Sequence, residues 1–112
     1  MAISLIPGII NSSFERIGNF GGNDAGTYSY TLPPDGFYIV FFKKTNTYDS
    51  AQLGAYLVNA VSSNGGRVAI RPLAALPENM SVTIEIVDGK FVLTLDTGAS
   101  TYMRGYVFKI GG

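Results

Sequence analysis

Hydrophobic and polar residues alternate one by one along several stretches of the chain, which is the period of a β-strand with one buried face. Residues 26–32, GTYSYTL, carry two tyrosines and a leucine on one face and three hydroxyl side chains on the other. Residues 81–87, SVTIEIV, and 90–95, KFVLTL, alternate in the same way. The side chains expected to face a core are Tyr28, Tyr30, Leu32, Val82, Ile84, Ile86, Phe91, Leu93 and Leu95. The pattern therefore predicts three half-buried strands.

Turn residues separate these strands. Asp88-Gly89 lies between the second and the third, and a type I′ hairpin turn needs positive φ at both central residues, which Asp-Gly tolerates. Another turn is predicted at residues 33–36, PPDG, because proline presets φ and glycine accepts positive φ. The Asp-Gly turn predicts that residues 81–95 form one β-hairpin.

Two further strands are predicted from their aromatic and β-branched content. Residues 37–44, FYIVFFKK, are apolar on both faces, which predicts a central strand that is covered on both sides. Residues 102–110, YMRGYVFKI, are predicted to form the last strand, with Tyr106, Phe108 and Ile110 facing inward.

One segment, residues 50–61, fits two secondary structures. Its apolar residues recur at helical spacing, and Asp49 with Gln52 resembles a helix capping box, which predicts one short helix. In the other interpretation residues 54–61 form a strand that turns and pairs with residues 67–71. The strand is favoured, because Gly54 weakens a helix and the other clear elements are β.

The N-terminal part, residues 1–25, gives weaker signals. Short strands are predicted around residues 4–6 and 14–17, and the glycine-rich stretch GNFGGNDAG, residues 18–26, is predicted to be a loop. The first ten residues are apolar but carry no basic cluster, so we expect no signal peptide.

The chain as a whole is predicted to form one domain. Its 112 residues suffice for a single core, with the N-terminal strands and loop over 1–25 and the main sandwich over 26–112. Seven to nine short strands with regular turns indicate an all-β fold, an antiparallel β-sandwich or jelly roll.

The amino-acid composition limits the kinds of surface and partner that the protein can have. Charged residues make up 14% of the chain, against a typical value of about 25%, so neutral polar groups must form much of the surface. Such a surface suits an assembly protein or an extracellular β-protein. Eight basic and eight acidic residues cancel, and the longest basic run is Lys43-Lys44, so nucleic acid is not an expected partner.

The chain contains no cysteine and no histidine. Structural zinc and catalysis by Ser-His or Cys-His pairs are therefore excluded. The acidic residues form no calcium-loop motif, and we expect no metal and no cofactor.

The stretch Leu95-Asp96-Thr97-Gly98-Ala99 resembles the catalytic motif of retropepsin-like aspartic proteases. That resemblance implies a dimer in which two Asp96 carboxylates share a proton. Only 14 residues follow Gly98, however, so no flap hairpin can follow the motif. The favoured alternative is an ordinary turn, in which Asp bonds its own backbone and Gly takes positive φ.

Three of the seven tyrosines, Tyr48, Tyr56 and Tyr102, are candidate ligand-binding residues because they have polar neighbours. Sugars bind against aromatic faces that are edged by hydrogen-bonding groups. The alternative is that these tyrosines pack across strands and leave their hydroxyls in water.

Residues 27–42, 54–74 and 81–110 together resemble the small β-sandwich domains of bacteriophage virion proteins, such as tail-fibre tips, baseplate accessories and head fibres or decorations. The resemblance implies a non-enzymatic structural or assembly protein, a tail or capsid accessory with a potential part in host receptor binding. It also implies a homo-oligomer, such as a trimer, with other virion proteins or a host surface glycan as partners and no membrane insertion. The location implied is the virion, assembled in the host cytoplasm.

Residues 10–15, INSSFE, are similar to the opening strand of jelly-roll carbohydrate-binding modules. This local resemblance implies a secreted or cell-surface glycan-binding module as the alternative function. The chain lacks tryptophan, in which it departs from that pattern.

Overall fold

The computed structural model describes residues 15–46 and 52–111 of the chain. Eight β-strands and one 3-10 turn make up the regular structure of these residues. The elements are β1 (Glu15–Gly22), β2 (Thr27–Leu32), β3 (Gly36–Lys44), β4 (Leu53–Val61), η1 (Ser63–Gly65), β5 (Arg67–Ala74), β6 (Ser81–Val87), β7 (Lys90–Asp96) and β8 (Met103–Gly111). The predicted all-β fold is confirmed.

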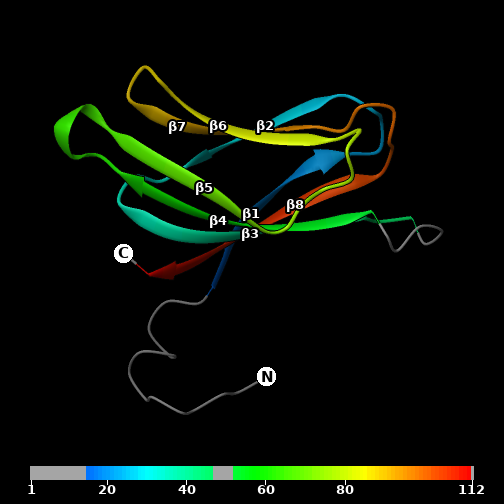
Figure 1. The fold of residues 1–112 in the computed structure, drawn as a ribbon, viewed down its shortest axis with the longest axis horizontal. Helices are drawn as coiled ribbons and strands as arrows, with labels where there is room; N and C mark the ends of the chain where they lie inside the picture. The colour runs from blue at the N-terminus through cyan, green and yellow to red at the C-terminus, as the bar shows by residue number, and fades with distance from the viewer. Residues whose placement is uncertain (1–14, 47–51, 112) are drawn as a thin grey trace, which may run out of the picture.

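The strands form two antiparallel sheets that lie one above the other (Figure 1). The larger sheet has five strands in the order β1-β8-β3-β4-β5, and the smaller has three in the order β2-β7-β6. Strands β3, β4 and β5 follow one another both along the chain and across the sheet, whereas the β1–β8 and β2–β7 pairs join distant parts of the chain. The result is a β-sandwich.

The core lies between the two sheets and is built from alternate residues of each strand. Every inward position predicted for β2, β6 and β7 is either buried or packed against the buried cluster. The largest side chains that are almost fully buried are Tyr38, Phe42, Phe91, Leu32, Leu93, Leu95 and Met103. Apolar alternation thus places one face of each sheet in the interior.

Residues 53–61 are a strand, so the helix considered for this segment is wrong over the described residues. The strand pairs with β5 in the predicted hairpin, for example Val58 with Ile70. Gly54 fits the strand because it lies against the buried Leu76, whose Cγ would be 2.9 Å from an added Cβ. The strand has apolar residues on both faces, and some of these residues happen to recur at the spacing of a helix.

The loop predicted for residues 18–26 is also wrong in its first half, since β1 continues to Gly22. Phe20 is buried and pairs with Gly105 of β8. Gly18 and Gly22 lie within this strand, and both positions need glycine because the rings of Tyr30 and Tyr28 occupy the space that a side chain would fill. The strand predicted at residues 4–6 lies outside the described residues, as does the beginning of the one predicted at 14–17.

The inward set predicted for β8 is reversed. Met103, Gly105 and Val107 face the core, whereas Tyr106 and Phe108 alternate to the other side. Ile110 is half-buried and lies at the register shift between β8 and β3. A Cβ at residue 105 would lie 2.6 Å from Cε1 of Phe20 and 2.8 Å from Cε1 of Phe42. Residue 105 therefore faces the interior as a glycine, because two phenylalanine rings already fill the space that a side chain would need.

Strand β3 is central, as predicted, but the described residues form a covering layer on only one of its faces. It lies between β8 and β4, and Tyr38, Val40 and Phe42 point into the core. On the opposite face Phe37 and Phe41 are each 38% exposed. Over the described residues, the prediction of a strand covered on both sides is therefore wrong.

Both predicted turns are present, with one difference in detail. Asp88 and Gly89 have φ values of 51° and 75°, as a type I′ turn between β6 and β7 requires. In the PPDG turn Asp35, not Gly36, takes the positive φ of 59°. Gly36 is buried at the start of β3, where the Tyr38 hydroxyl leaves no room for a side chain.

Candidate functional site

The Asp96-Thr97-Gly98 stretch is a turn whose polar groups are engaged locally. The Oδ1 atom of Asp96 accepts a hydrogen bond of 2.9 Å from the Gly98 N–H, and Gly98 has a φ of 61°. Thr97 is fully buried and exchanges hydrogen bonds with Gly26: its Oγ1 accepts from Gly26 N at 2.8 Å, and its N–H donates to Gly26 O at 2.9 Å. The predicted turn geometry is confirmed.

Close packing around Gly98 fixes this turn against the loop before β6. A side chain at residue 98 would collide with the carbonyl oxygen of Asn79. The Asn79 side-chain amide donates to Ser100 Oγ at 3.4 Å, and Ser100 N–H donates to Thr97 O at 3.0 Å. The arrangement joins the two chain segments at this end of the sandwich, and the bond from Gly98 to Asp96 holds the turn.

The three candidate tyrosines do not form one platform in the described structure. Tyr56 faces the interior, where its ring packs edge-on against Phe42 at 5.9 Å and its hydroxyl accepts a 2.9 Å hydrogen bond from Leu76 N–H. Tyr102 is 39% exposed in the turn before β8. Tyr48 lies outside the described residues. The packing alternative fits Tyr56, whereas the ring of Tyr102 is exposed.

A carboxylate clamp joins the β2–β3 turn to the end of β4. Asp35 accepts hydrogen bonds from Ser62 at both carboxylate oxygens, 2.7 Å from Ser62 Oγ and 2.8 Å from Ser62 N. These bonds, first that of the side chain and then that of the backbone, hold the pKa of Asp35 below its usual value.

We expect the Ser62→Ala variant to raise the pKa of Asp35 toward that of an ordinary aspartate. A lowered folded-state pKa stabilises the fold above about pH 4 and loses that contribution as the pH falls toward the folded-state pKa. Carboxyl ¹³C chemical shifts across an acid titration measure the pKa directly. A wild-type Asp35 that titrates at the unperturbed value, or one that Ser62→Ala leaves unchanged, would show that the clamp does not form in solution.

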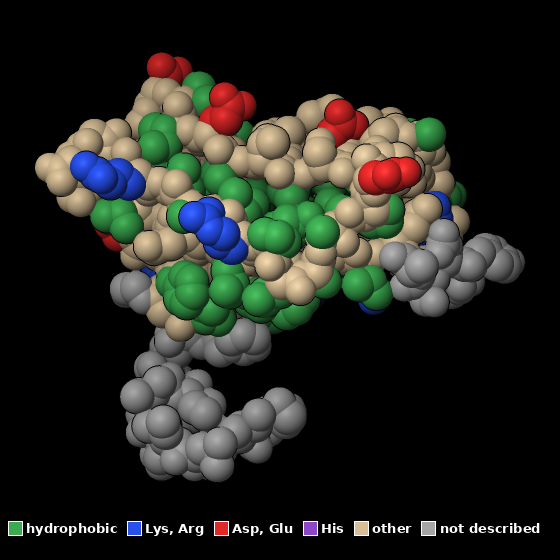
Figure 2. All heavy atoms as spheres, in the orientation of Figure 1, with side chains coloured by type: hydrophobic (Ala, Val, Ile, Leu, Met, Phe, Trp, Pro, Cys, Tyr) green, Lys and Arg blue, Asp and Glu red, His purple; other side chains and the backbone are tan. Residues whose placement is uncertain are grey.

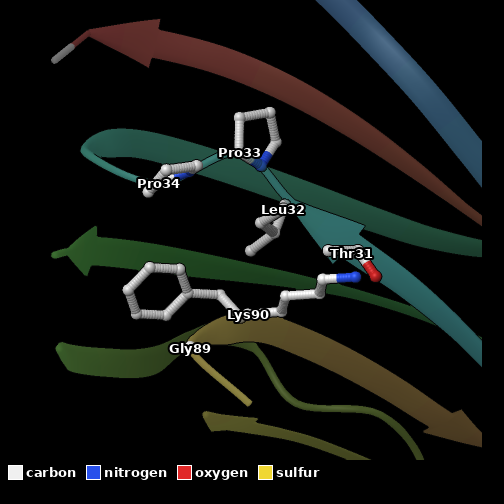
Figure 3. A pocket seen from close by; sticks show the side chains of 7 residues that line it. Thr31, Leu32, Pro33, Pro34, Gly89 and Lys90 are labelled. Carbon is white, nitrogen blue, oxygen red and sulfur yellow. The ribbon is translucent and has the colours of Figure 1, made fainter. Parts of the chain in front are cut away.

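An open hollow lies where β2 ends and β7 begins (Figure 3). Its lining is Thr31, Leu32, Pro33, Pro34, Gly89, Lys90 and Phe91. Figure 3 shows the Lys90 side chain extended toward Thr31. Lys90 is the only titratable group of the lining, so the hollow holds no pair of groups for acid-base chemistry.

Charge is divided unequally between the sheets although the whole chain is neutral. Of the eight Lys and Arg residues, seven belong to strands of the five-stranded sheet and only Lys90 to the other sheet. Glu15 is the only acidic residue in those five strands. Figure 2 shows acidic side chains along the upper, three-stranded layer. The five-stranded sheet is therefore strongly basic, although the net charge of the chain is zero.

The basic residues border an apolar surface that we call the outer face, the side of the five-stranded sheet turned away from the core. Cross-strand pairs define its centre, which consists of Ile39, Phe41, Ala55, Leu57, Tyr106 and Phe108. The register places cations around this centre, at Arg16, Lys43, Arg67, Arg71 and Arg104. Figure 2 shows hydrophobic side chains along the lower margin of the molecule, below this sheet.

Contacts within the outer face join its central strands. Phe41 and Phe108 pack edge-to-face at 5.7 Å, and the Lys43 ammonium lies 5.9 Å from the centre of the Tyr106 ring. Lys43 and Arg104 are directly opposite each other on β3 and β8. No salt bridge with another described residue neutralises this pair, although Arg104 donates to Asn23 Oδ1 at 3.1 Å.

Sequence reasoning did not identify the outer face as a site. The stretch FYIVFFKK is apolar on both faces, which is the sequence pattern of this surface. The pattern was interpreted as a strand whose second face is covered by the chain itself. The described part of the chain supplies only one covering layer, the three-stranded sheet.

Comparison of the chain with protein-family models, curated proteins and solved structures finds no match. In the described ranges no helix is long and apolar enough to cross a membrane. The same residues contain no cluster of three or more acidic side chains that could hold a metal ion.

Proposed function

We infer that this chain is a non-enzymatic structural or assembly protein of a phage-like virion, a tail or capsid accessory. The observation that carries the proposal is the outer face, a broad apolar surface on a small domain. Phe37 and Phe41 are each 38% exposed there, and Leu53, which lies opposite Lys43 on β4, is 49% exposed. Apolar side chains gathered on one face indicate a surface for protein contacts.

The chemistry of the other candidate sites supports this proposal. Asp96 holds a turn, Tyr56 packs in the core, and the hollow beside Lys90 contains one titratable side chain. The virion assignment itself rests on the resemblance of residues 26–110 to small virion β-sandwich domains.

Mass spectrometry of gradient-purified particles tests the proposal. Particles released from cells that carry this gene should contain the chain in amounts comparable with other structural proteins. The particle-free fraction of the same lysate is the control. Absence of the chain from the particles, with abundant chain in the particle-free fraction, would overturn the proposed function.

A further inference from the structure

We propose that a second copy of this chain packs its outer face against the outer face of the first, which gives a twofold dimer with four stacked sheets. The proposal deepens the assembly role inferred above and rests on it for its biological meaning. It concerns the partner and the residues in contact, which that role leaves open.

The first argument is that β3 has the composition of a strand covered on both sides. Tyr38, Val40 and Phe42 are covered by the smaller sheet, but Phe41 on the other side is 38% exposed. A strand with apolar side chains on both faces is typical of a sheet with a layer on each side. The described residues supply one of these layers, so the other comes from outside them.

The second argument is that the outer face has the area that a stable dimer needs. Five strands spaced about 4.8 Å apart, each rising about 26 Å over eight residues, cover roughly 600 Å². Two such faces in contact over their whole extent, rim included, would bury about 1,200 Å² of surface in all, which reaches the lower bound for specific protein interfaces.

The third argument is that the apolar centre of a second outer face matches that of the first in chemistry. Sheets pack face to face when both present apolar side chains, as the two sheets within this chain do. A twofold axis would bring the uncharged centre, with Ile39, Phe41 and Leu57, against the same centre of the partner copy. The cations would remain at the rim, in contact with water.

The rim charges determine how salt acts on this dimer. Lys43 and Arg104 already face each other within one copy, and a second copy would add the like charges of its own rim. Salt screens that repulsion, and the apolar centre does not depend on such screening. The dimer should therefore become tighter as salt increases. A partner that carries acidic residues at its rim would behave in the opposite way.

Sedimentation equilibrium of the full chain at about 50 mM and about 500 mM NaCl tests the proposal. We expect dimers, with a dissociation constant that falls as salt is added. Phe41→Ser should weaken the dimer by about tenfold or more, because it removes a central aromatic contact. Val87→Ser is the matched control, because Val87 is 47% exposed on the other sheet and should leave the dissociation constant unchanged.

If Phe41→Ser fails to fold, a variant at the rim of the outer face tests the dimer instead. Arg71→Glu lowers the positive charge of the rim, so it should tighten the dimer at low salt and reduce its salt dependence. Monomers at every concentration, trimers, association that weakens with salt, or association that Val87→Ser disrupts would each overturn the proposal. Dimers of the expected behaviour from a chain that is absent from particles would uphold the interface and refute only the virion function.

Discussion

Replacing Phe42 with alanine is expected to lower the free energy of unfolding by about 3–5 kcal/mol. Phe42 is 1% exposed and packs edge-on against both Phe20 and Tyr56. Its removal leaves a cavity between the sheets that these rings cannot close. Because small domains have about 5–15 kcal/mol of stability in total, this variant should be close to unfolding at room temperature. Urea denaturation followed by circular dichroism measures the change.

The neighbouring residue provides the matched control. Phe41→Ala removes the same ring from the outer face, where it is 38% exposed but contacts Phe108, so the monomer should lose only about 1–2 kcal/mol of its free energy of unfolding. Dilute protein should be used, because association on this face would add a concentration-dependent contribution. Equal losses from the two variants would show that β3 does not divide its side chains between core and surface as described.

Replacing Gly105 with valine is expected to cost about 3 kcal/mol through overpacking, and to lower Tm by roughly 12 °C. The added Cβ would lie 2.6 Å from Cε1 of Phe20, and the ring of Phe42 is also within 3 Å. Both rings are buried, so neither can move aside without disturbing the core. Thermal denaturation of the two proteins gives the difference in Tm.

Gly111 lies on the same strand and is the control for β-propensity and backbone entropy. A Cβ at this position meets no atom within 4 Å, so Gly111→Val should leave Tm nearly unchanged. If Gly105→Val were as stable as Gly111→Val, residue 105 would face solvent, and the inward set predicted from sequence would be the correct one.

The parts of the fold that sequence predicted are those with a local physical signal. The Asp88-Gly89 hairpin has strict alternation on both sides and a dipeptide that accepts positive φ twice. The turn at Asp96 likewise has a local signal, since Asp96 bonds the Gly98 N–H and Gly98 takes positive φ. Both features can be recognised from a short stretch of sequence, without knowledge of distant contacts.

The failures come from long-range packing. Strand β8 is apolar on both faces, and only the rings of Phe20 and Phe42, far away in sequence, decide that Gly105 points inward. Strand β1 has a single buried side chain, Phe20, among its glycines, so no alternation marks it as a strand.

The candidate site could not be predicted for the same reason. Arg16, Arg71 and Arg104 come from three strands that meet only through the order β1-β8-β3-β4-β5. Net charge and basic runs, the quantities that sequence provides, gave no sign of a basic border around an apolar face. Sheet order creates that arrangement.

Site-specific cross-linking tests the central claim, that the outer face is where copies of this chain meet. The chain has no cysteine, so single-cysteine variants report one position at a time. Ala55→Cys places a thiol beside Phe41 in the centre of the outer face, and Thr83→Cys places one on an exposed position of the smaller sheet. With a short bismaleimide, Ala55→Cys should give covalent dimers while Thr83→Cys remains monomeric. Dimers from Thr83→Cys alone, or from neither variant, would contradict the account.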